Sequence, residues 1–336
     1  MEVSAMKAMV LEKYGDSYAF VQRDVKTPSP SPGQVLIKVV GSSVNPIDNK
    51  IVTLGNELAF APALPAILGM DVSGIVEETG SGMSRFYPGD RVFGCAGGLG
   101  FLPGALAEYM VVDERLIAPA PVQMDLADAA TVPLVSITAW IGLFTRASLK
   151  EGQKLLVHAG AGGVGHMAVQ LGVHAGAEVY ATVSSDAKAA VVEEMGGIPI
   201  NYNDIPVDKY VKTATDGEGF DVVFDTVGGK NLDASFKAAA KGGQVVSTVT
   251  RSVHDLSIMH AKGLSLHVVF MLLPMLTGEG RALHGQILTE VAGLVDEGKL
   301  AVLLDEARFE YTQIAAAHRH WASGDALGKI SIIVSS

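Results

Sequence analysis

Cysteine is nearly absent from this chain of 336 residues, in which Cys95 stands alone. A single cysteine excludes an intrachain disulfide and a cysteine-based metal cluster, and this composition is typical of a reducing cytoplasm. Long apolar runs are missing too. The longest, 264–276, has about 13 residues and contains His267 and Pro274, whereas a membrane helix needs about 20 residues. We therefore expect a buried strand there. Because residues 1–7 show no apolar signal core, the sequence predicts a cytoplasmic protein with no membrane partner.

Basic residues are also scarce. Lys and Arg total 25 against 36 Asp and Glu, which gives a formal net charge of −11. This balance argues against nucleic acid as a partner, because the phosphate backbone attracts basic surfaces. It leaves anionic cofactors open, since a phosphate site needs only local donors. Hydrophobic residues make up 49% and glycines number 38, so the chain can bury a large core. The length predicts about two domains.

The first third is rich in turn residues and short β-type runs. Pro28, Pro30 and Pro32 mark a loop, and Pro88-Gly89-Asp90 marks a turn. Many short strands between such turns predict a barrel-like β domain. The expected strands are 35–40, 74–78, 90–93 and 107–112.

The pattern changes near residue 125. It becomes helical over 126–149, with Pro133 as an interruption, and strands then alternate with helices. This rhythm predicts a doubly wound parallel sheet of the α/β class. The expected strands are 154–158, 178–183, 221–224, 244–248 and 264–271, with helices at 164–175 and 186–195. The tail, with helices at 281–297 and 312–322 and a strand at 329–334, should pack back onto the first domain. The expected domains are 1–125 with 272–336, and 126–271.

A glycine-rich segment follows the strand that ends at His158 and opens a helix. It fits the pattern G-x-G-x-x-G and consists of Gly160, Ala161, Gly162, Gly163, Val164 and Gly165. Without Cβ atoms the backbone can approach a pyrophosphate closely, and the N–H groups and positive end of the helix then face the phosphates. In this context the motif predicts a dinucleotide site.

The end of the next strand indicates which dinucleotide is bound. An NAD site usually places a carboxylate there to hold the ribose hydroxyls. Here Ser184 and Ser185 follow the strand and Lys188 comes shortly after. Hydroxyls and an ammonium group suit a 2′-phosphate, so NADPH is the predicted cofactor. Asp186 is interpreted as a helix N-cap, with ribose contact as the alternative.

With these residues in view, the chain resembles the zinc-independent quinone oxidoreductase branch of the medium-chain dehydrogenase/reductase superfamily, along nearly its whole length. The segments that carry the resemblance are 45–48 (NPID), 67–74 (ILGMDVSG), 88–94 (PGDRVFG), 104–109 (GALAEY), 138–140 (TAW), 158–165 (HAGAGGVG), 220–229 (FDVVFDTVGG) and 328–330 (GKI). The resemblance implies a Rossmann domain joined to a GroES-like β-barrel catalytic domain.

The resemblance also implies roles for individual positions. Family members often carry an aromatic residue where this chain has Lys50, so the substrate pocket should differ. Asn45 is expected beside the nicotinamide and the substrate, with Asp48 and Lys50 in the substrate pocket. The residues expected around the cofactor, besides the glycine segment, are Thr138 at the nicotinamide end, Ser184, Ser185, Lys188 and Tyr202 at the adenosine phosphate, the segments Val227-Gly228 and Phe270-Met271, and Lys329 from the last strand.

Zinc ligands are missing from the positions where the zinc-dependent branch carries them. Asn45 stands where the first Cys would be, and Gly69-Met70-Asp71 stands in place of Gly-His-Glu. A tetrahedral zinc site needs Cys, His or carboxylate ligands in such places, so we expect no metal. Without a Lewis acid, a conjugated acceptor is the suitable substrate, because negative charge can spread to its oxygen. The side-chain amide of Asn45 is the candidate donor to that oxygen.

The sequence therefore predicts an NADPH-dependent oxidoreductase that reduces a quinone or an α,β-unsaturated carbonyl without zinc. An enoyl-thioester reductase is an alternative with the same chemistry. An NADPH-binding structural or sensor protein with little turnover is a second alternative, since fold does not fix function. The apolar strand expected at 264–271 would form the edge of the sheet. In members of the family this edge strand pairs with the same strand of a second chain, which implies a homodimer.

Overall fold

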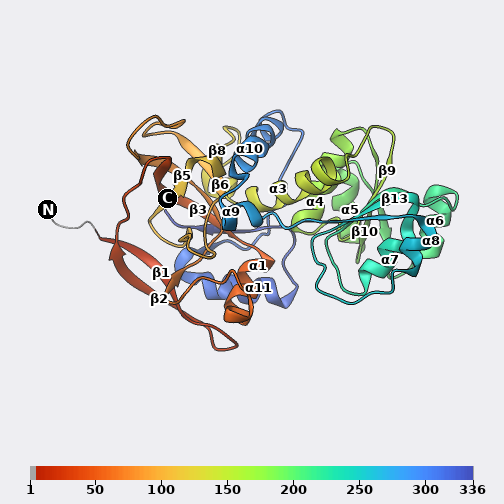
Figure 1. Ribbon diagram of the computed structural model, residues 1–336, viewed down its shortest axis with the longest axis horizontal. Helices are drawn as coiled ribbons and strands as arrows, with labels where there is room; N and C mark the ends of the chain where they lie inside the picture. Colours follow the sequence, from red (N-terminus) through yellow and green to blue (C-terminus); the bar gives the residue numbers. More distant parts are fainter. Residues whose placement is uncertain (1–4, 336) are drawn as a thin grey trace. The chain divides into compact units, whose positions relative to one another are not determined.

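The computed structural model describes residues 5–335, so part of the segment 1–7, for which no apolar signal core was expected, lies outside the described residues. The chain divides into two compact units. The first comprises residues 1–134, 272–298 and 304–336, and the second 135–271 and 299–303 (Figure 1). The first boundary falls at 134 rather than at the expected 125. The short helix α2 (Leu126–Ala129) packs on strands of the first unit, which accounts for the difference; they are β3 (Gln34–Val44), β5 (Asp71–Thr79) and β16 (Ile330–Ile333).

The first unit is built on a sheet of seven strands with the order β15-β16-β3-β5-β6-β8, in which β7 also pairs with β3; its pairs are antiparallel except for the parallel pair β15–β16. Its strands are β3 (Gln34–Val44), β5 (Asp71–Thr79), β6 (Arg91–Cys95), β7 (Tyr109–Asp113), β8 (Ile117–Pro119), β15 (Phe309–Glu310) and β16 (Ile330–Ile333). A smaller sheet has the order β2-β1-β4, formed by β1 (Ala5–Lys13), β2 (Ala19–Lys26) and β4 (Ala66–Ile67). The C-terminal strand thus pairs with β3 near the N-terminus, as expected for a tail that returns to the first domain.

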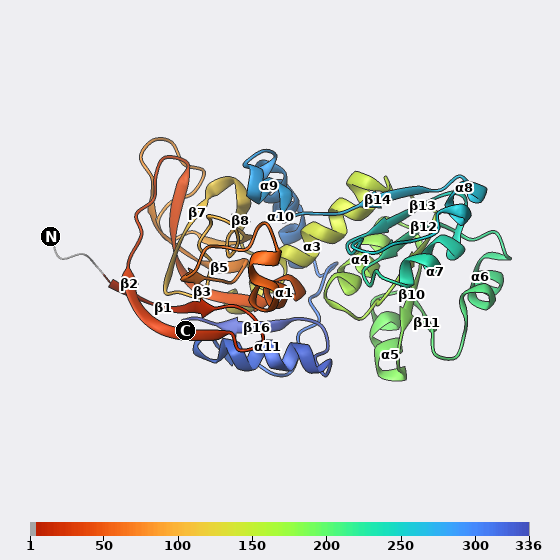
Figure 2. The same ribbon diagram turned by 60° about the horizontal axis from the view of Figure 1, so that its bottom comes forward.

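Helices cover this unit on several sides. The long helix α10 packs against β6 and β8, and α11 packs against β2, β3 and β16 (Figure 2). Their bounds are α1 (Pro46–Leu54), α9 (Leu273–Thr277), α10 (Arg281–Asp296) and α11 (Ile314–Ser323), with 3₁₀ turns at η1 (Gly55–Glu57), η2 (Glu114–Leu116) and η4 (Tyr311–Gln313).

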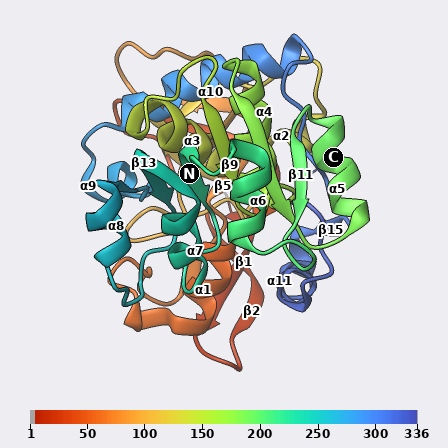
Figure 3. The same cartoon turned by 90° about the vertical axis from the view of Figure 1, so that its right-hand side faces the viewer.

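The second unit contains a parallel sheet of six strands with the order β11-β10-β9-β12-β13-β14 (Figure 3). The order reverses direction at β9 and β12, which is the mark of a doubly wound sheet. The strands are β9 (Lys154–Val157), β10 (Glu178–Val183), β11 (Ile198–Asn201), β12 (Phe220–Asp225), β13 (Ala239–Ser247) and β14 (Ser265–Val268). The helices are α3 (Pro133–Trp140), α4 (Gly163–His174), α5 (Asp186–Glu194), α6 (Val207–Thr215), α7 (Asn231–Ala238) and α8 (Ser257–Lys262), with a π-helical turn η3 (Ile141–Arg146).

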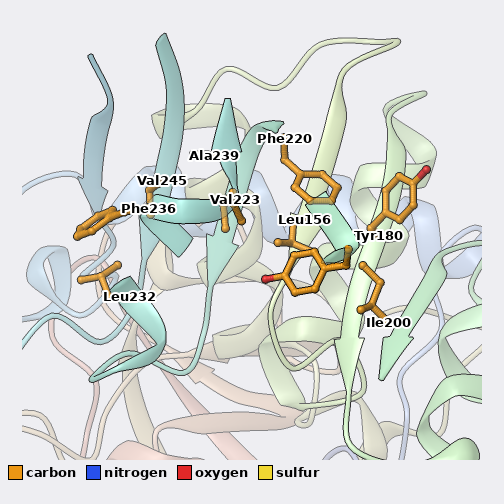
Figure 4. Close-up of a cluster of buried hydrophobic side chains, with 11 residues drawn as sticks. Leu156, Tyr180, Ile200, Phe220, Val223, Leu232, Phe236, Ala239 and Val245 are labelled. Atoms are coloured by element: carbon orange, nitrogen blue, oxygen red, sulfur yellow. The ribbon is translucent and has the colours of Figure 1, made fainter. Parts of the chain in front are cut away.

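One face of this sheet carries an apolar cluster against the helices α6, α7 and α8. Leu232 and Phe236 of α7 lie over Val223 and Val245 of the central strands, and Phe220 has no solvent exposure (Figure 4). The strands read as near-continuous apolar runs because both of their faces are covered. This core holds the strands of the sheet in place. The site described below lies at the carboxyl ends of these strands.

The segment 264–276 departs from the expected buried strand. Only Ser265–Val268 pairs as β14, at the sheet edge, and Val268 is 46% exposed. The helical run that includes α2, α3 and η3 (126–146) is, by length and composition alone, the one described segment apolar enough to cross a membrane. Within that run, 89% of the most apolar window is buried inside the structure, so it also meets the description of a core helix. The expected interruption of the helical stretch is present: α2 ends at Ala129, and Pro133 is the first residue of α3, where a missing N–H is tolerated.

Candidate functional site

The glycine segment forms the connection from β9 to α4, at the carboxyl end of the sheet. A Cβ at Gly160 would come within 2.5 Å of the Cβ of Ala181, and one at Gly165 would come within 2.0 Å of the backbone oxygen of Ala159. These two glycines therefore allow the loop, β10 and α4 to pack directly against one another. Ala161 between them is buried.

Gly162 is in a different situation. It is the N-cap of α4 with φ −83°, and a Cβ there would meet only Ala159, whose backbone oxygen would be 3.1 Å away and whose Cβ would be 3.9 Å away. Gly162, Gly163 and Val164 are half-buried, so the first turn of the helix is accessible. The N–H groups of a first helical turn have no partner within the helix and carry partial positive charge. A pyrophosphate fits this turn, because the protein itself leaves the space beside Gly162 open.

His158 supports this loop. Its Nδ1 lies 3.2 Å from Oγ1 of Thr182, and its carbonyl accepts a hydrogen bond from the hydroxyl of Thr226. Burial lowers the pKa of His158 to about 4, so the ring is neutral at physiological pH. The ring of His158 contacts β10, its backbone bonds to Phe224 of β12 and to Thr226 just after that strand, and the neutral ring has no charge to offer a substrate.

The end of β10 brings the predicted phosphate ligands together. Nζ of Lys188 donates to the hydroxyl of Ser184 at 3.3 Å, so the ammonium group bends back over the strand end. The N-cap of α5 is Ser185, whose hydroxyl accepts from the N–H of Lys188 at 3.4 Å. Asp186 was expected to be that cap and is instead the first helical residue. Ser185, one residue earlier, has the extended backbone that an N-cap residue requires, and its hydroxyl is the hydrogen-bond acceptor.

The adjacent strand β11 adds two side chains at the same edge. Tyr202 is 53% exposed and directly follows β11, whose last residue pairs with Val183 of β10. Asn203 donates from Nδ2 to the carbonyl of Ser184 at 3.1 Å. Sequence reasoning missed Asn203. Its place after a strand that neighbours the phosphate-binding strand was the available signal.

The turn after β12 is organised by a buried carboxylate. Asp225 accepts from the N–H groups of Val227 (2.8 Å) and Gly228 (2.9 Å), and from the side chains of Asn231 and Ser235. Gly228 has φ +72°, and a Cβ there would meet the carbonyl of Val249 at 2.4 Å. The expected cofactor segment Val227-Gly228 is thus a rigid turn, and Val227 is 49% exposed.

Three other positions that were predicted to contact the cofactor lie in this unit, and they differ in their exposure to solvent. Thr138 lies in α3 and is buried, Phe270 is 44% exposed just after β14, and Met271 is buried. The structure therefore gathers the glycine segment, the ends of β10 and β11 and the turn after β12 along the carboxyl ends of neighbouring strands. Ligands bind at this edge in doubly wound sheets.

The first unit contains a second polar group of residues, which is deeply buried. Nδ2 of Asn45 donates to Oδ2 of Asp71 at 2.8 Å, and Ser43 donates to the same oxygen at 2.7 Å. Nζ of Lys329 donates to Oδ1 of Asn45 at 2.5 Å and to the carbonyl of Val44 at 3.0 Å. The ammonium lies 3.9 Å from Oδ2 of Asp71, as an ion pair. We call Ser43, Asn45, Asp48, Asp71 and Lys329 the buried polar cluster.

Burial acts against both charges in the ion pair. It raises the pKa of Asp71 and lowers the pKa of Lys329. The attraction between them opposes both shifts, as do the hydrogen bonds that Asp71 accepts from Asn45, Ser43 and the N–H of Leu134. A buried pair with this many hydrogen bonds holds its members in one arrangement.

This arrangement differs from two expectations. Asn45 was expected to donate to a substrate oxygen, but its side chain has no exposure, and both ends of the amide are used within the protein. Lys329 was expected to reach the cofactor, but it is 3% exposed and two of its N–H groups go to Asn45 and Val44. Both residues instead fix the end of β3 relative to β5 and β16.

Asp48 and Lys50 lie on α1 and do not meet. Asp48 is 2% exposed and its Oδ2 accepts from the N–H of Asn45 at 2.9 Å, while its Oδ1 has no hydrogen-bond partner in the described chain. Desolvation and the nearby charge of Asp71 raise the pKa of Asp48 to about 7. Lys50 is exposed. The expected pocket pair therefore consists of one buried acid and one surface cation.

Within residues 5–335, no three His, Cys, Asp or Glu side chains are grouped so that they could hold a metal ion. Sequence reasoning did not assign two members of the buried polar cluster, Ser43 and Asp71, to the site. A lone Asp inside an apolar run, as in Leu68-Gly-Met-Asp-Val72, was the signal that could have identified Asp71.

Comparisons with known proteins give matches to segments of both units. Residues 31–122 match the family model of the alcohol dehydrogenase GroES-like domain, and residues 198–332 match a model described as zinc-binding dehydrogenase. The chain is 31% identical to 2-methylene-furan-3-one reductase of Solanum lycopersicum over 98% of this chain and 79% of that protein. It is 33% identical to quinone oxidoreductase of Rattus norvegicus, over 70% of each.

Some relatives are much longer. The chain is 33% identical to a spectinabilin polyketide synthase protein, NorB, of Streptomyces orinoci, but it spans only 13% of that protein's length. Among solved structures, an alcohol dehydrogenase superfamily protein from Novosphingobium aromaticivorans is 40% identical with a TM-score of 0.94, over 98% of this chain and all of that one. A mycobacterial protein solved in complex with NADPH is 26% identical with a TM-score of 0.84, over 98% of this chain and all of that one.

Proposed function

The chain belongs to the medium-chain dehydrogenase/reductase superfamily, in its quinone oxidoreductase-like branch, and on that premise we propose that it uses NADPH to reduce a quinone or an α,β-unsaturated carbonyl without zinc. The relatives support the acceptor class, since they include a furanone reductase, a quinone oxidoreductase and an NADPH-dependent alkenal/one oxidoreductase of Arabidopsis thaliana. When bound, NADPH supplies the hydride.

The observation that carries the choice of cofactor is the contact between Lys188 and Ser184. It places an ammonium group and a hydroxyl at the end of β10, where an NAD site usually has a carboxylate. Tyr202 and Asn203 stand at the end of the neighbouring strand. These side chains would hold the 2′-phosphate, and the first turn of α4 would hold the pyrophosphate.

The buried polar cluster has a positioning role in this proposal. Asn45 is locked between Asp71 and Lys329, and Asp48 accepts from the N–H of Asn45. The cluster therefore fixes the peptide at which β3 passes into α1. Developing negative charge on an acceptor oxygen requires preorganised donors, and we assign that duty to backbone N–H groups and solvent rather than to the amide of Asn45.

The polyketide synthase relatives favour an enoyl-thioester reductase as a second candidate. In that case the acceptor would carry a thioester in place of a ketone or aldehyde, and the hydride would still go to a conjugated carbon. An NADPH-binding protein with little turnover is the third candidate. One assay separates the three, because each predicts a different pattern of NADPH consumption.

The purified protein is mixed with NADPH and, in turn, with quinones, short alkenals and enoyl-CoA, and the loss of NADPH absorbance is followed. We expect turnover with quinones or alkenals that exceeds turnover with enoyl-CoA. Preference for enoyl-CoA would support the second candidate. Tight NADPH binding with no acceptor consumed would overturn the reductase proposal.

Metal analysis tests the zinc-free part. We expect far less than one zinc per chain after purification, and activity that is unchanged by a chelator, because the described residues offer no three-ligand group. Stoichiometric zinc, or activity lost to the chelator and restored by zinc, would contradict this part of the proposal.

A further inference from the structure

Three side chains of the second unit are aligned as a serine, a histidine and an aspartate. Oγ of Ser252 lies 2.5 Å from Nε2 of His254, and Nδ1 of His254 lies 2.8 Å from Oδ1 of Asp233. Ser252 and His254 belong to the loop between β13 and α8, and Asp233 belongs to the first turn of α7. None of the three takes part in the reductase proposal.

The contacts determine the roles of the two ring nitrogens. A carboxylate oxygen can only accept, so the hydrogen bond to Asp233 places a proton on Nδ1 of His254. In the neutral ring, Nε2 then carries a lone pair, which accepts the hydroxyl proton of Ser252. A nucleophile hydrogen-bonded to a base, with the base oriented by a third group, is the recognisable arrangement of an activated serine.

The base is held firmly. Its side chain is only 8% exposed, and its ring lies edge-on to the ring of Phe236, with 6.2 Å between centroids and an interplanar angle of 85°. The start of the loop is pressed against the turn after β12, since a Cβ at Gly228 would meet Val249 at 2.4 Å. Ser252 itself is tied by its N–H to the carbonyl of Thr250 at 2.9 Å.

The nucleophile is accessible and has apolar neighbours. Ser252 is exposed, Val253 beside it is fully exposed, and Leu256 is 55% exposed. The N–H groups of Val253 and His254 have no hydrogen-bond acceptor within residues 5–335. They are therefore available to a negatively charged oxygen that forms beside the serine. Apolar side chains and free donors suit a carboxylic ester with an apolar acyl group.

We propose that Ser252 is a nucleophilic serine that accepts an acyl group from activated carboxylic esters, with His254 as general base and Asp233 as the residue that orients it. Oγ forms a bond to the carbonyl carbon while Nε2 takes the hydroxyl proton. The bond to the leaving oxygen then breaks, and that oxygen receives the proton. Water, activated by the same nitrogen, next cleaves the acyl-serine and releases the acid. The sum is ester plus water to acid plus alcohol, with no oxidant or reductant.

The experiment uses p-nitrophenyl acetate with the purified full-length chain. We expect rapid release of about one equivalent of p-nitrophenolate per chain, followed by slower turnover, and an acetyl group on the peptide that contains Ser252. Ser252→Ala should abolish the burst and the label. His254→Gln should slow acylation about 100-fold or more, the usual contribution of a general base. Asp233→Asn should slow it at least about tenfold, because the tautomer is no longer fixed.

Ser257→Ala is the matched control. Ser257 is exposed at the start of the neighbouring helix, but its hydroxyl donates to Asp255 rather than to a histidine. This variant should keep the burst and the label. Each variant is also checked for an unchanged thermal unfolding midpoint and for NADPH binding, because none of the substituted residues is among those expected to contact the cofactor. Acetylation spread over lysines, or a burst that survives Ser252→Ala, would overturn the proposal, and neither outcome bears on the reductase function.

Discussion

At the scale of single residues, Asp48 combines burial with a titration in the neutral range. Its pKa rises from 3.8 to about 7 because of desolvation and the charge of Asp71. A carboxyl group whose pKa is raised in the folded state makes the protein less stable as pH increases between these two values. The loss of stability caused by the buried charge is absent at pH values below 3.8 and complete at pH values above about 7.

Asp48→Asn removes this titration and keeps an oxygen that can accept from the N–H of Asn45. We expect the free energy of unfolding of the variant, relative to the original chain, to rise by roughly 2 to 3 kcal/mol between pH 5 and pH 8. Urea titrations at pH 5, 6, 7 and 8 measure it. Asp16→Asn, which makes the same change at an exposed carboxylate, is the matched control. An equal pH dependence in both variants would contradict the raised pKa.

Lys188 tests the phosphate assignment at the same scale. Lys188→Glu replaces the ammonium beside Ser184 with a carboxylate, which repels a 2′-phosphate. We expect NADPH affinity to fall about tenfold or more, as for the loss of one charge-assisted hydrogen bond, while NADH affinity changes little. Fluorescence titration with both nucleotides measures this. Lys209→Glu makes the same charge change at an exposed position on α6 and should affect neither. Equal losses for NADPH and NADH would remove the phosphate role from Lys188.

At the scale of elements, the strands and helices of the second unit were predictable because their signals are local. The expected strand 178–183 coincides with β10, and the expected helix 164–175 lies within one residue of α4 at each end. Elements with weak signals were not foreseen. The strand β2 has mostly exposed residues and no apolar alternation. The helix α1 begins with a capping box of Asn45 and Asp48, which in the sequence resembles an ordinary polar loop.

The glycine segment allows a prediction that separates packing from binding. Gly165→Ala forces a Cβ to within 2.0 Å of the backbone oxygen of Ala159, so we expect a loss of roughly 1 to 3 kcal/mol of stability. The Cβ added by Gly162→Ala has no neighbour closer than the backbone oxygen of Ala159 at 3.1 Å, so this variant should change stability by less than about 1 kcal/mol. If a pyrophosphate occupies the space beside Gly162, that same variant should lose NADPH affinity about tenfold or more. Thermal unfolding and nucleotide titration of both variants measure these effects, and a Gly162→Ala variant that binds NADPH normally would place the pyrophosphate elsewhere.

At the scale of the whole molecule, the order of the parts could be predicted from the sequence, and the contacts of the buried polar cluster could not. The fold class follows from the change in pattern near residue 125, which the structure places at the boundary of its two units within nine residues. The amide of Asn45, by contrast, is paired with Asp71 and Lys329, which lie 26 and 284 positions away along the chain. Hydrogen bonds over such separations depend on the register of β3, β5 and β16, and no local pattern reports that register. The oxyanion role expected of Asn45 came from its residue type and from the family resemblance, neither of which reports these contacts.

The free edge of the parallel sheet bears on the assembly of the molecule. β14 pairs with β13 on one side only, and Val268 on it is 46% exposed. An apolar edge strand with unpaired backbone groups favours pairing with another chain, so we predict a homodimer through β14, of twice the chain mass of 35.0 kDa. Val268→Lys should shift the mass measured by light scattering toward that of one chain, because the lysine of one copy would face the same lysine of the other across the symmetry axis.

Ile198→Lys is the matched control. Ile198 is 44% exposed on β11, the opposite edge of the same sheet, and its substitution should leave the dimer intact. A dimer lost equally in both variants would indicate general destabilisation, and a dimer kept in Val268→Lys would place the interface on another surface.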